Sequence, residues 1–264
     1  MCQHKIETVN DRILFNMTKR ASISAIVLTK NSQNTIRNCL ESVKWVDEII
    51  IVDDYSIDST VSICREYAHK ILERRLDSFS SQKNYGIEKA SSDWILSIDS
   101  DEIVSDELKK QIRTLLCAED ALRYGYFVPF KNYVGKKWLR FGGLYPDYHL
   151  RLFKRGKANF ERPIHETVQI ADAGYLSAAV IHHTYESYRD FYDKVKAYSA
   201  RESRYLKETQ AIPRFYYLRL FLEPLATFLN VYVKLQGFRD GFAGLVNAVF
   251  LSVYRWRLYY LMKN

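Results

Sequence analysis

The chain has 264 residues, of which 47% are hydrophobic and 27% are charged, so it can bury a sizeable core and wholesale disorder is excluded. Its 39 Lys and Arg residues exceed its 31 Asp and Glu residues by eight. This basic balance indicates an anionic partner: nucleic acid, a phospholipid surface or a phosphorylated substrate. The longest run without a charge, residues 241–254, has 14 residues and is too short to span a bilayer. The four cysteines form no CxxC pair and the N-terminus lacks the apolar core of a signal peptide, which together are typical of a reducing compartment.

Residues 1–20 are polar and mixed, which predicts a loosely attached arm. After them, short apolar and β-branched runs predict four buried strands, at 23–29, 49–52, 69–72 and 94–98. Segments whose apolar residues recur at helical spacing lie between these strands and after the last of them. Because strands and helices alternate about every 25 residues, the pattern predicts βαβ crossovers and an α/β fold with a mostly parallel central sheet.

The pattern changes from about residue 121. Residues 124–133 and 178–182 predict further strands, and a loop rich in Gly and Pro lies between them at 141–146. Residues 188–264 have a helical pattern and are rich in aromatic and basic side chains. The predicted organisation is therefore an arm at 1–20, an α/β domain at 21–187 and an amphipathic helical extension at 188–264.

Acidic residues directly follow two of the predicted strands. Asp53 and Asp54 end the second strand, and Asp99 and Asp101 end the fourth. Ligands of open α/β sheets bind at the carboxyl ends of the strands, and two carboxylates two residues apart can reach one hard cation such as Mg²⁺ or Mn²⁺. For each pair the alternative is a solvated loop whose acids cap the next helix. The sequence has neither a GxGxxG nor a GxxxxGKS/T motif, so a metal ion is the expected means of holding a diphosphate here.

Four segments of the first hundred residues resemble glycosyltransferase family 2, whose members have the Rossmann-like GT-A nucleotide-sugar-binding fold. These segments are IVLTKN at 26–31, IVDDYSIDST at 51–60, QKNYGI at 82–87 and LSIDSDE at 96–102. The resemblance implies a pocket for a nucleotide-sugar. The residues implied to contact it are Thr29, Asn31, Asp53, Asp54, Gln82, Lys83 and Asn84. Asp101 is implied to ligate the Mg²⁺ or Mn²⁺ of the diphosphate, with Asp99 reaching the nucleotide sugar or the metal.

Segments of the second half resemble the lipopolysaccharide inner-core β-1,4-glucosyltransferase subgroup. They lie at 142–156, 163–166, 182–185 and 237–244, so the resemblance covers about residues 21–260. Two departures stand out. Ser32 lies where many relatives carry Glu, and His165-Glu166 lies where many family 2 enzymes carry Glu-Asp.

Glu166 is the predicted general base. A sugar hydroxyl has a very high pKa, so its proton must leave as the new glycosidic bond forms, and a carboxylate within about 3 Å can take it. Such an in-line displacement inverts the anomeric centre. Asp147 is the rival for this role, or it contacts the acceptor sugar together with Tyr145.

Two further side chains are candidates for the diphosphate end of the site. Arg151 lies in a basic run with Lys154 and Arg155, and a guanidinium pairs well with a diphosphate or a phosphorylated acceptor. A solvated basic face is the alternative. His182 follows a predicted strand and is a candidate ligand of the metal or the diphosphate, with simple packing as the alternative.

The C-terminal residues 214–264 carry seven Lys and Arg and two acids, which is +5 of the total +8. Aromatic and basic residues on helices suit the interface of an anionic membrane. The alternative is a buried helical pair that packs on the catalytic domain or on a second subunit. No RNA- or DNA-binding module is recognisable, so nucleic acid is not the expected partner.

The sequence thus predicts an inverting, divalent-metal-dependent glycosyltransferase. It would move a sugar, with glucose from a UDP-sugar as the first choice, onto a lipopolysaccharide core or another lipid-linked glycan. The expected location is the cytoplasmic face of the inner membrane, as a peripheral protein. The alternatives are transfer of another hexose in capsule or lipid-carrier glycan synthesis, and a catalytically silent GT-A scaffold on the membrane.

Overall fold

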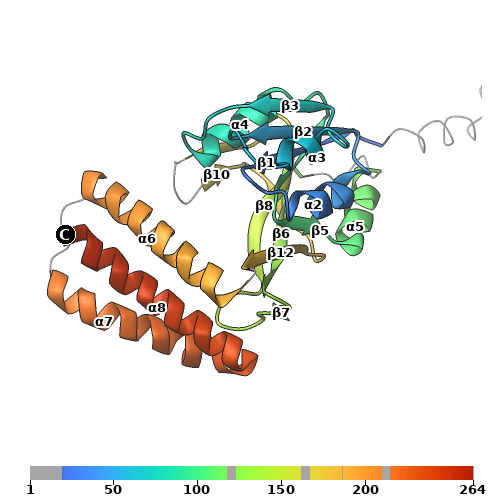
Figure 1. The fold of residues 1–264 in the computed structure, drawn as a ribbon. Coiled ribbons are helices and arrows are strands. Elements are labelled where there is room, and N and C mark those ends of the chain that lie inside the picture. The colour runs from blue at the N-terminus through green and yellow to red at the C-terminus, as the bar shows by residue number, and fades with distance from the viewer. Residues whose placement is uncertain (1–19, 118–122, 162–166, 186, 210–214, 264) are drawn as a thin grey trace, which may run out of the picture. The chain divides into compact units, whose positions relative to one another are not determined.

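The computed structural model describes residues 20–117, 123–161, 167–185, 187–209 and 215–263 (Figure 1). The chain divides into two compact units. Unit 1 comprises residues 1–128 and 150–178, and unit 2 comprises residues 129–149 and 179–264. Strands β6 (Gly125–Val134) and β8 (Asp147–Lys154) each contribute residues to both units. The predicted arm falls almost wholly outside the described residues.

Unit 1 is built on a parallel sheet. Its strands are β1 (Ile23–Thr29), β2 (Glu48–Asp53), β3 (Lys70–Glu73) and β4 (Trp94–Asp99), in the order β3-β2-β1-β4. All residues of β1 and β2 are buried, as expected of strands covered on both faces. The C-terminal half of β8 joins β4 as an antiparallel strand. The expected α/β fold with a mostly parallel sheet is therefore confirmed.

The strand register of unit 1 places its acidic residues at one edge. Thr29 pairs with Asp53 across β1 and β2, and Leu28 pairs with Asp99 across β1 and β4. The carboxyl ends of three neighbouring strands therefore lie level, as the sequence predicts for a ligand site.

Helices connect these strands. They are α2 (Ile36–Val43), α3 (Thr60–Cys64), α4 (Phe79–Glu88) and α5 (Asp106–Leu116). The hydroxyls of Ser78 and Ser105 accept hydrogen bonds from backbone N–H groups of α4 and α5, which caps both helices. Gly86 lets α4 lie close to the sheet, because a Cβ at this position would come within 2.6 Å of Ile26.

Short strands complete unit 1. They are β5 (Glu102–Val104), β9 (Asn159–Glu161), β10 (Thr167–Gln169) and β11 (Ala173–Tyr175). Strands β9 and β10 pair with each other, and β11 pairs with the first part of β6.

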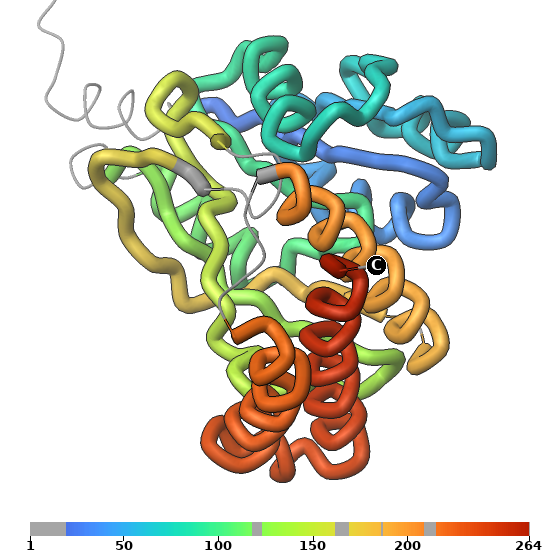
Figure 2. The backbone as a smooth tube through the Cα atoms, turned by 90° about the vertical axis from the view of Figure 1, so that its left-hand side faces the viewer, coloured from blue at the N-terminus to red at the C-terminus, as the bar shows by residue number. Residues whose placement is uncertain are grey.

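Unit 2 combines strands with a helical C-terminal part. The second half of β6 pairs with β7 (Lys137–Trp138) and β12 (Val180–Tyr185). The helical segments that follow are α6 (Tyr188–Thr209), α7 (Tyr216–Phe228), the π-helical turn η1 (Leu229–Lys234), the 3₁₀ turn η2 (Gly237–Asp240) and α8 (Phe242–Lys263). Helix α8 packs against both α6 and α7, and two views show the three helices side by side (Figures 1 and 2). The helical C-terminal region is confirmed, and across the described chain no helix is both long and apolar enough to cross a bilayer.

Candidate functional site

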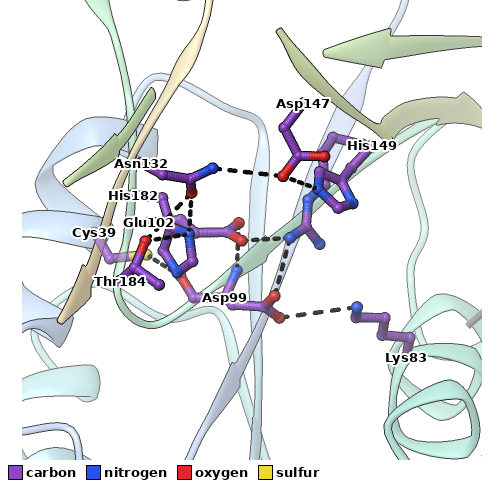
Figure 3. A network of polar contacts seen from close by, with 10 residues as sticks. Cys39, Lys83, Asp99, Glu102, Asn132, Asp147, His149, His182 and Thr184 are labelled. Atoms are coloured by element: carbon purple, nitrogen blue, oxygen red, sulfur yellow. Dashed lines mark hydrogen bonds and ion pairs between the residues drawn. The ribbon is translucent and has the colours of Figure 1, made fainter. Parts of the chain in front are cut away.

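An ion-pair network lies at the carboxyl end of β4 in unit 1 (Figure 3). The guanidinium of Arg151, from β8, donates from Nη2 to Oδ2 of Asp99 at 3.0 Å and to the carboxylate of Glu102. Glu102 in turn accepts the backbone N–H of Asp99 at 3.0 Å. The side chains of Arg151 and Glu102 are only 8% and 2% exposed, whereas that of Asp99 is 34% exposed. The network therefore holds Asp99 in place while leaving part of its carboxylate open to solvent.

Lys83 supplies the second cation of this network. Its ammonium group lies 4.0 Å from Oδ1 of Asp99, and its side chain is buried on α4 rather than exposed at the helix start. Burial opposes ionisation of Asp99, but the charges of Lys83 and Arg151 outweigh it and hold the pKa of this carboxyl well below its usual range. Asp99 is therefore an anion at any physiological pH.

Asp101 lies in the turn between β4 and β5, two residues beyond Asp99, and is half-buried. Among the described residues, no three His, Cys, Asp or Glu side chains gather into a group that could hold a metal. Asp99 faces two cations, and Asp101 follows it in the turn as the other candidate acid for a divalent ion. Mg²⁺ is commonly bound through one or two carboxylates plus substrate phosphates. The residues present thus fit an ion that enters with a diphosphate, rather than a cage formed by protein alone.

Thr29 and Asp54 lie at the carboxyl ends of β1 and β2. The hydroxyl of Thr29 is buried and has no hydrogen-bond partner among the described residues. Asp54 accepts the backbone N–H of Leu76 at 3.0 Å and lies 3.2 Å from the ammonium of Lys30. A buried hydroxyl without a partner costs free energy unless a ligand satisfies it, so Thr29 is suited to a ligand contact.

Asp53 and Asn31 brace the loop after β2. Asp53 is buried and accepts the backbone N–H and the hydroxyl of Ser56 at 2.8 and 2.6 Å. Asn31 has a φ of 47° and binds the same loop through Ser56 and the backbone N–H of Ile57. In the structure, both side chains fix the shape of residues 53–57.

Gln82 and Asn84 hold α4 in place. The amide of Gln82 donates to the carbonyl of Arg74 at 2.6 Å, and Asn84 makes two hydrogen bonds to the backbone of Phe160 at 2.9 and 3.1 Å. Both contacts position the helix that carries Lys83.

A second polar cluster lies within unit 2 (Figure 3). Asp147, at the start of β8, has Oδ2 at 3.1 Å from Nε2 of His149 and at 3.4 Å from the amide nitrogen of Asn132. Burial raises the pKa of Asp147, but the hydrogen bond and charge of His149 outweigh this and the pKa is lowered overall. The carboxylate is thus better suited to accept hydrogen bonds than to accept a proton.

His182 and Thr184, on β12, complete this cluster. Nδ1 of His182 lies 2.9 Å from the amide oxygen of Asn132, and the Thr184 hydroxyl donates to the same oxygen at 3.3 Å. Tyr145 precedes Asp147 by two residues, and its ring packs edge-on against Trp138. The cluster thus gathers two of the predicted residues, Asp147 and His182, while the ring contact of Tyr145 is with Trp138.

The segment Gly237–Gly244, which the resemblance singled out, has a structural role in unit 2. Asp240 is buried and accepts the backbone N–H groups of Arg140 and Phe141 at 2.9 and 2.8 Å. Gly244 lies so close to η2 that a Cβ on it would come within 1.9 Å of the Gly237 carbonyl oxygen. This segment therefore supports the loop that leads into Tyr145 and Asp147.

Four residues of these clusters were not predicted from the sequence. They are Glu102, Asn132, His149 and Thr184. Glu102 could have been found, because it is an acid at the start of an apolar segment and a buried acid requires a cation. His149 follows Asp147 by two residues on β8, so alternation along a strand could have placed it on the same face. Asn132 and Thr184 carry no local signal, since they come from other strands. Glu166, the predicted base, lies outside the described residues.

The sequence of the chain is similar to those of known proteins. The model of the family described as Glycosyl transferase family 2 matches residues 24–190. An uncharacterized glycosyltransferase of Rickettsia typhi is 27% identical over 250 residues, covering 89% of this chain and 84% of that protein. The lipopolysaccharide core biosynthesis glycosyltransferase LpsC of Rhizobium meliloti is 26% identical over 247 residues, covering 90% of both. A crystal structure of S. aureus TarS has a TM-score of 0.47 and 15% identity, covering 92% of this chain and 90% of that one.

Proposed function

Because the chain belongs to glycosyltransferase family 2, we propose that this glycosyltransferase moves a sugar from a nucleotide-sugar to a lipid-linked or lipopolysaccharide core glycan, with inversion at the anomeric carbon. UDP-glucose is the first candidate donor. The LpsC relative supports a lipopolysaccharide acceptor, since its name assigns it to core biosynthesis.

The observation that carries this proposal is the network around Asp99. A carboxylate that is ionised, held on one side by Arg151 and Lys83, and partly open on the other is a fixed acceptor for the hydroxyls of a nucleotide-sugar. The buried hydroxyl of Thr29, at the same edge of the sheet, is suited to the nucleotide. Asp101 is the proposed ligand of a Mg²⁺ or Mn²⁺ ion, which would offset the charge of the diphosphate.

The proposed reaction is a single displacement. The acceptor oxygen forms a bond to the anomeric carbon as the bond from that carbon to the diphosphate oxygen breaks, and the electron pair leaves with the diphosphate. Glu166 is the proposed proton acceptor for the attacking hydroxyl. One displacement gives inversion, without a covalent intermediate on the protein.

The polar cluster of unit 2 is the proposed acceptor-binding site. The lowered pKa of Asp147 favours a hydrogen-bonding role toward sugar hydroxyls over the role of base. His149 is half-exposed beside it and offers a further polar contact. Tyr145 adds a ring of the kind that packs against sugars. His182 stays a candidate for the metal or the diphosphate.

The proposed location is the cytoplasmic face of the inner membrane, where lipid-linked acceptors are made. Two other functions are alternatives: transfer of another hexose in capsule or lipid-carrier glycan synthesis, and a catalytically silent scaffold. The paired acids Asp99 and Asp101 favour an active enzyme over a scaffold.

The test is a donor screen followed by turnover. Purified protein is incubated with a panel of nucleotide-sugars and Mn²⁺ or Mg²⁺, and a rise in melting temperature identifies the donor that binds. UDP release is then measured with truncated core acceptors. Asp101→Ala is expected to abolish metal-dependent donor stabilisation, whereas Glu107→Ala, an exposed acid on α5, leaves it intact. No stabilisation by any nucleotide-sugar would contradict the proposal.

A further inference from the structure

Helix α7 and the π-helical turn η1 expose an unusual number of large apolar side chains. We call these residues the α7 face: Tyr217, Leu218, Phe221, Leu222, Leu225, Leu229 and Val233. Phe221 is 68% exposed, Leu218 57% and Leu225 56%. Isolated exposed apolar residues are normal, but a contiguous apolar patch marks an interaction surface.

The spacing of these residues explains why they share one face. Leu218, Leu222, Leu225 and Leu229 recur at intervals of three and four residues, which is the period of one side of a helix. The other side of α7 packs on α8, where the hydroxyl of Tyr216 donates to the carbonyl of Tyr259 at 2.8 Å. The exposed face is therefore the one that α8 leaves uncovered, apart from the ring of Tyr217, over which Lys263 of α8 lies.

Cations outnumber anions on the helical segments that carry and support the α7 face. Lys234 is exposed on η1, Arg255 is exposed on α8, and Lys263 lies over the ring of Tyr217. Of the two acids between residues 215 and 263, Glu223 lies 3.6 Å from Arg219, and Asp240 is buried and bound by backbone N–H groups. The net charge of these helical segments is therefore positive.

Two occupants could cover such a face: a second copy of the chain, or lipid. In a two-fold dimer the same patch meets itself, so the cationic border of one copy would face that of the other, which is unfavourable. An anionic lipid surface offers acyl chains to the apolar side chains and negative headgroups to the cations. The charge pattern therefore favours lipid.

We propose that the α7 face inserts into the interface of an anionic membrane, with α7 and η1 lying in the membrane plane. The surrounding cations contact the headgroups. This inference names the membrane-binding element of the chain, and it holds whichever donor and acceptor the enzyme uses.

The test is sedimentation of the full-length protein with vesicles of phosphatidylcholine alone, or of phosphatidylcholine with phosphatidylglycerol. The wild-type protein is expected to sediment with the mixed vesicles and to be released by high salt. The double variant Phe221→Ser with Leu225→Ser is expected to bind the mixed vesicles at least tenfold more weakly, because it removes apolar side-chain area that the lipid would bury. Ile57→Ser, an exposed apolar residue of unit 1, serves as the matched control and keeps wild-type binding.

A second variant tests the charges. Lys234→Gln with Arg255→Gln is expected to weaken binding to the mixed vesicles about tenfold. The melting temperature and the stabilisation by UDP-sugar are measured for every variant, so that loss of folding or of donor binding is distinguished from loss of lipid binding.

Three outcomes would overturn the proposal. One is that wild-type protein does not sediment with anionic vesicles. Another is that the Phe221 and Leu225 double variant binds them as well as wild type does. The third is that wild-type protein is a dimer that this double variant converts to a monomer, which would assign the α7 face to a second copy.

Discussion

Arg151 and Glu102 form a buried ion pair in which the guanidinium also donates to Asp99 at 3.0 Å. The two acids flank the turn between β4 and β5, and the cation comes from β8, which pairs with β4 as an antiparallel strand. One side chain thus fixes the position of the acid that we assign to the donor. Removing one partner of a buried pair leaves a charge uncompensated, which commonly costs about 3–5 kcal/mol.

Arg151→Lys is expected to lower stability and donor affinity together, because Nη2 of Arg151 meets both carboxylates and the lysine ammonium group lies one bond closer to the backbone. We expect a lower melting temperature and at least a tenfold loss of UDP affinity. Calorimetry and thermal unfolding measure both effects. Arg155→Lys is the matched control, since this exposed residue of the same basic run should behave as wild type.

Lys83→Met is expected to change the pH dependence of donor binding. Lys83 and Arg151 lower the pKa of Asp99, so removing Lys83 should raise that pKa toward its ordinary value. As the solution is acidified, the variant would then lose donor affinity at a higher pH than the wild type does. Titration calorimetry with UDP between about pH 3 and pH 6, a window that includes the ordinary pKa of an aspartate, checks this, and identical profiles would contradict the role given to Asp99.

Glu48 provides a pH-dependent contribution to stability. It is buried, and although burial opposes its ionisation, its contacts with Lys70, Ser24 and Ser91 lower its pKa to about 2. Because folding lowers the pKa of Glu48, its carboxylate stabilises the folded protein at pH values above the ordinary pKa of a glutamate. This stabilisation is lost as the pH falls toward 2.

The stability difference between the wild type and Glu48→Gln should therefore be largest at neutral pH. We expect it to shrink by roughly 1 kcal/mol between pH 6 and pH 3.5. Urea unfolding at the two pH values measures the change. A difference that does not depend on pH would mean that folding does not lower the pKa of Glu48.

Asp147→Asn separates acceptor binding from proton transfer. If Asp147 contacts the acceptor, the KM for the acceptor should rise about tenfold while kcat falls little, because only a hydrogen bond is weakened. Glu166→Gln should instead lower kcat by about 10²–10⁴, the usual worth of a general base. Steady-state kinetics on both variants decides which acid is the base, and a collapse of kcat in Asp147→Asn alone would exchange the two roles.

Gly244→Ala should destabilise unit 2. Its Cβ would meet the Gly237 carbonyl oxygen at 1.9 Å, so the backbone must move, at a cost of about 1–3 kcal/mol. Gly156→Ala is the comparison, since there a Cβ meets nothing within 4 Å and only the positive φ of 75° is unfavourable. Denaturant unfolding of the two variants should show the larger loss in Gly244→Ala.

The fold was predictable because β1, β2 and β4 are largely apolar runs, and because β2 and β4 end in the acids Asp53 and Asp99, which parallel strands bring to one edge of the sheet. Strand β8 was not anticipated. Its sequence, DYHLRLFK, mixes charged, aromatic and aliphatic residues after a loop rich in Gly and Pro. Arg151 looks like a surface residue until its partners Asp99 and Glu102 are known. Local patterns reveal which residues start or end an element, whereas buried ion pairs depend on contacts between segments far apart in the sequence.

Asp240 has a practical consequence for work on this enzyme. Its carboxylate holds the backbone of Arg140 and Phe141, and the buried Leu139 packs in one cluster with Phe191 and Ala243 from the C-terminal helices. A shortened protein made by cutting off these helices to improve yield would lose both supports of the segment that precedes Tyr145 and Asp147. Expression trials should therefore keep the chain through Lys263 and raise solubility by replacing exposed residues of α7 instead.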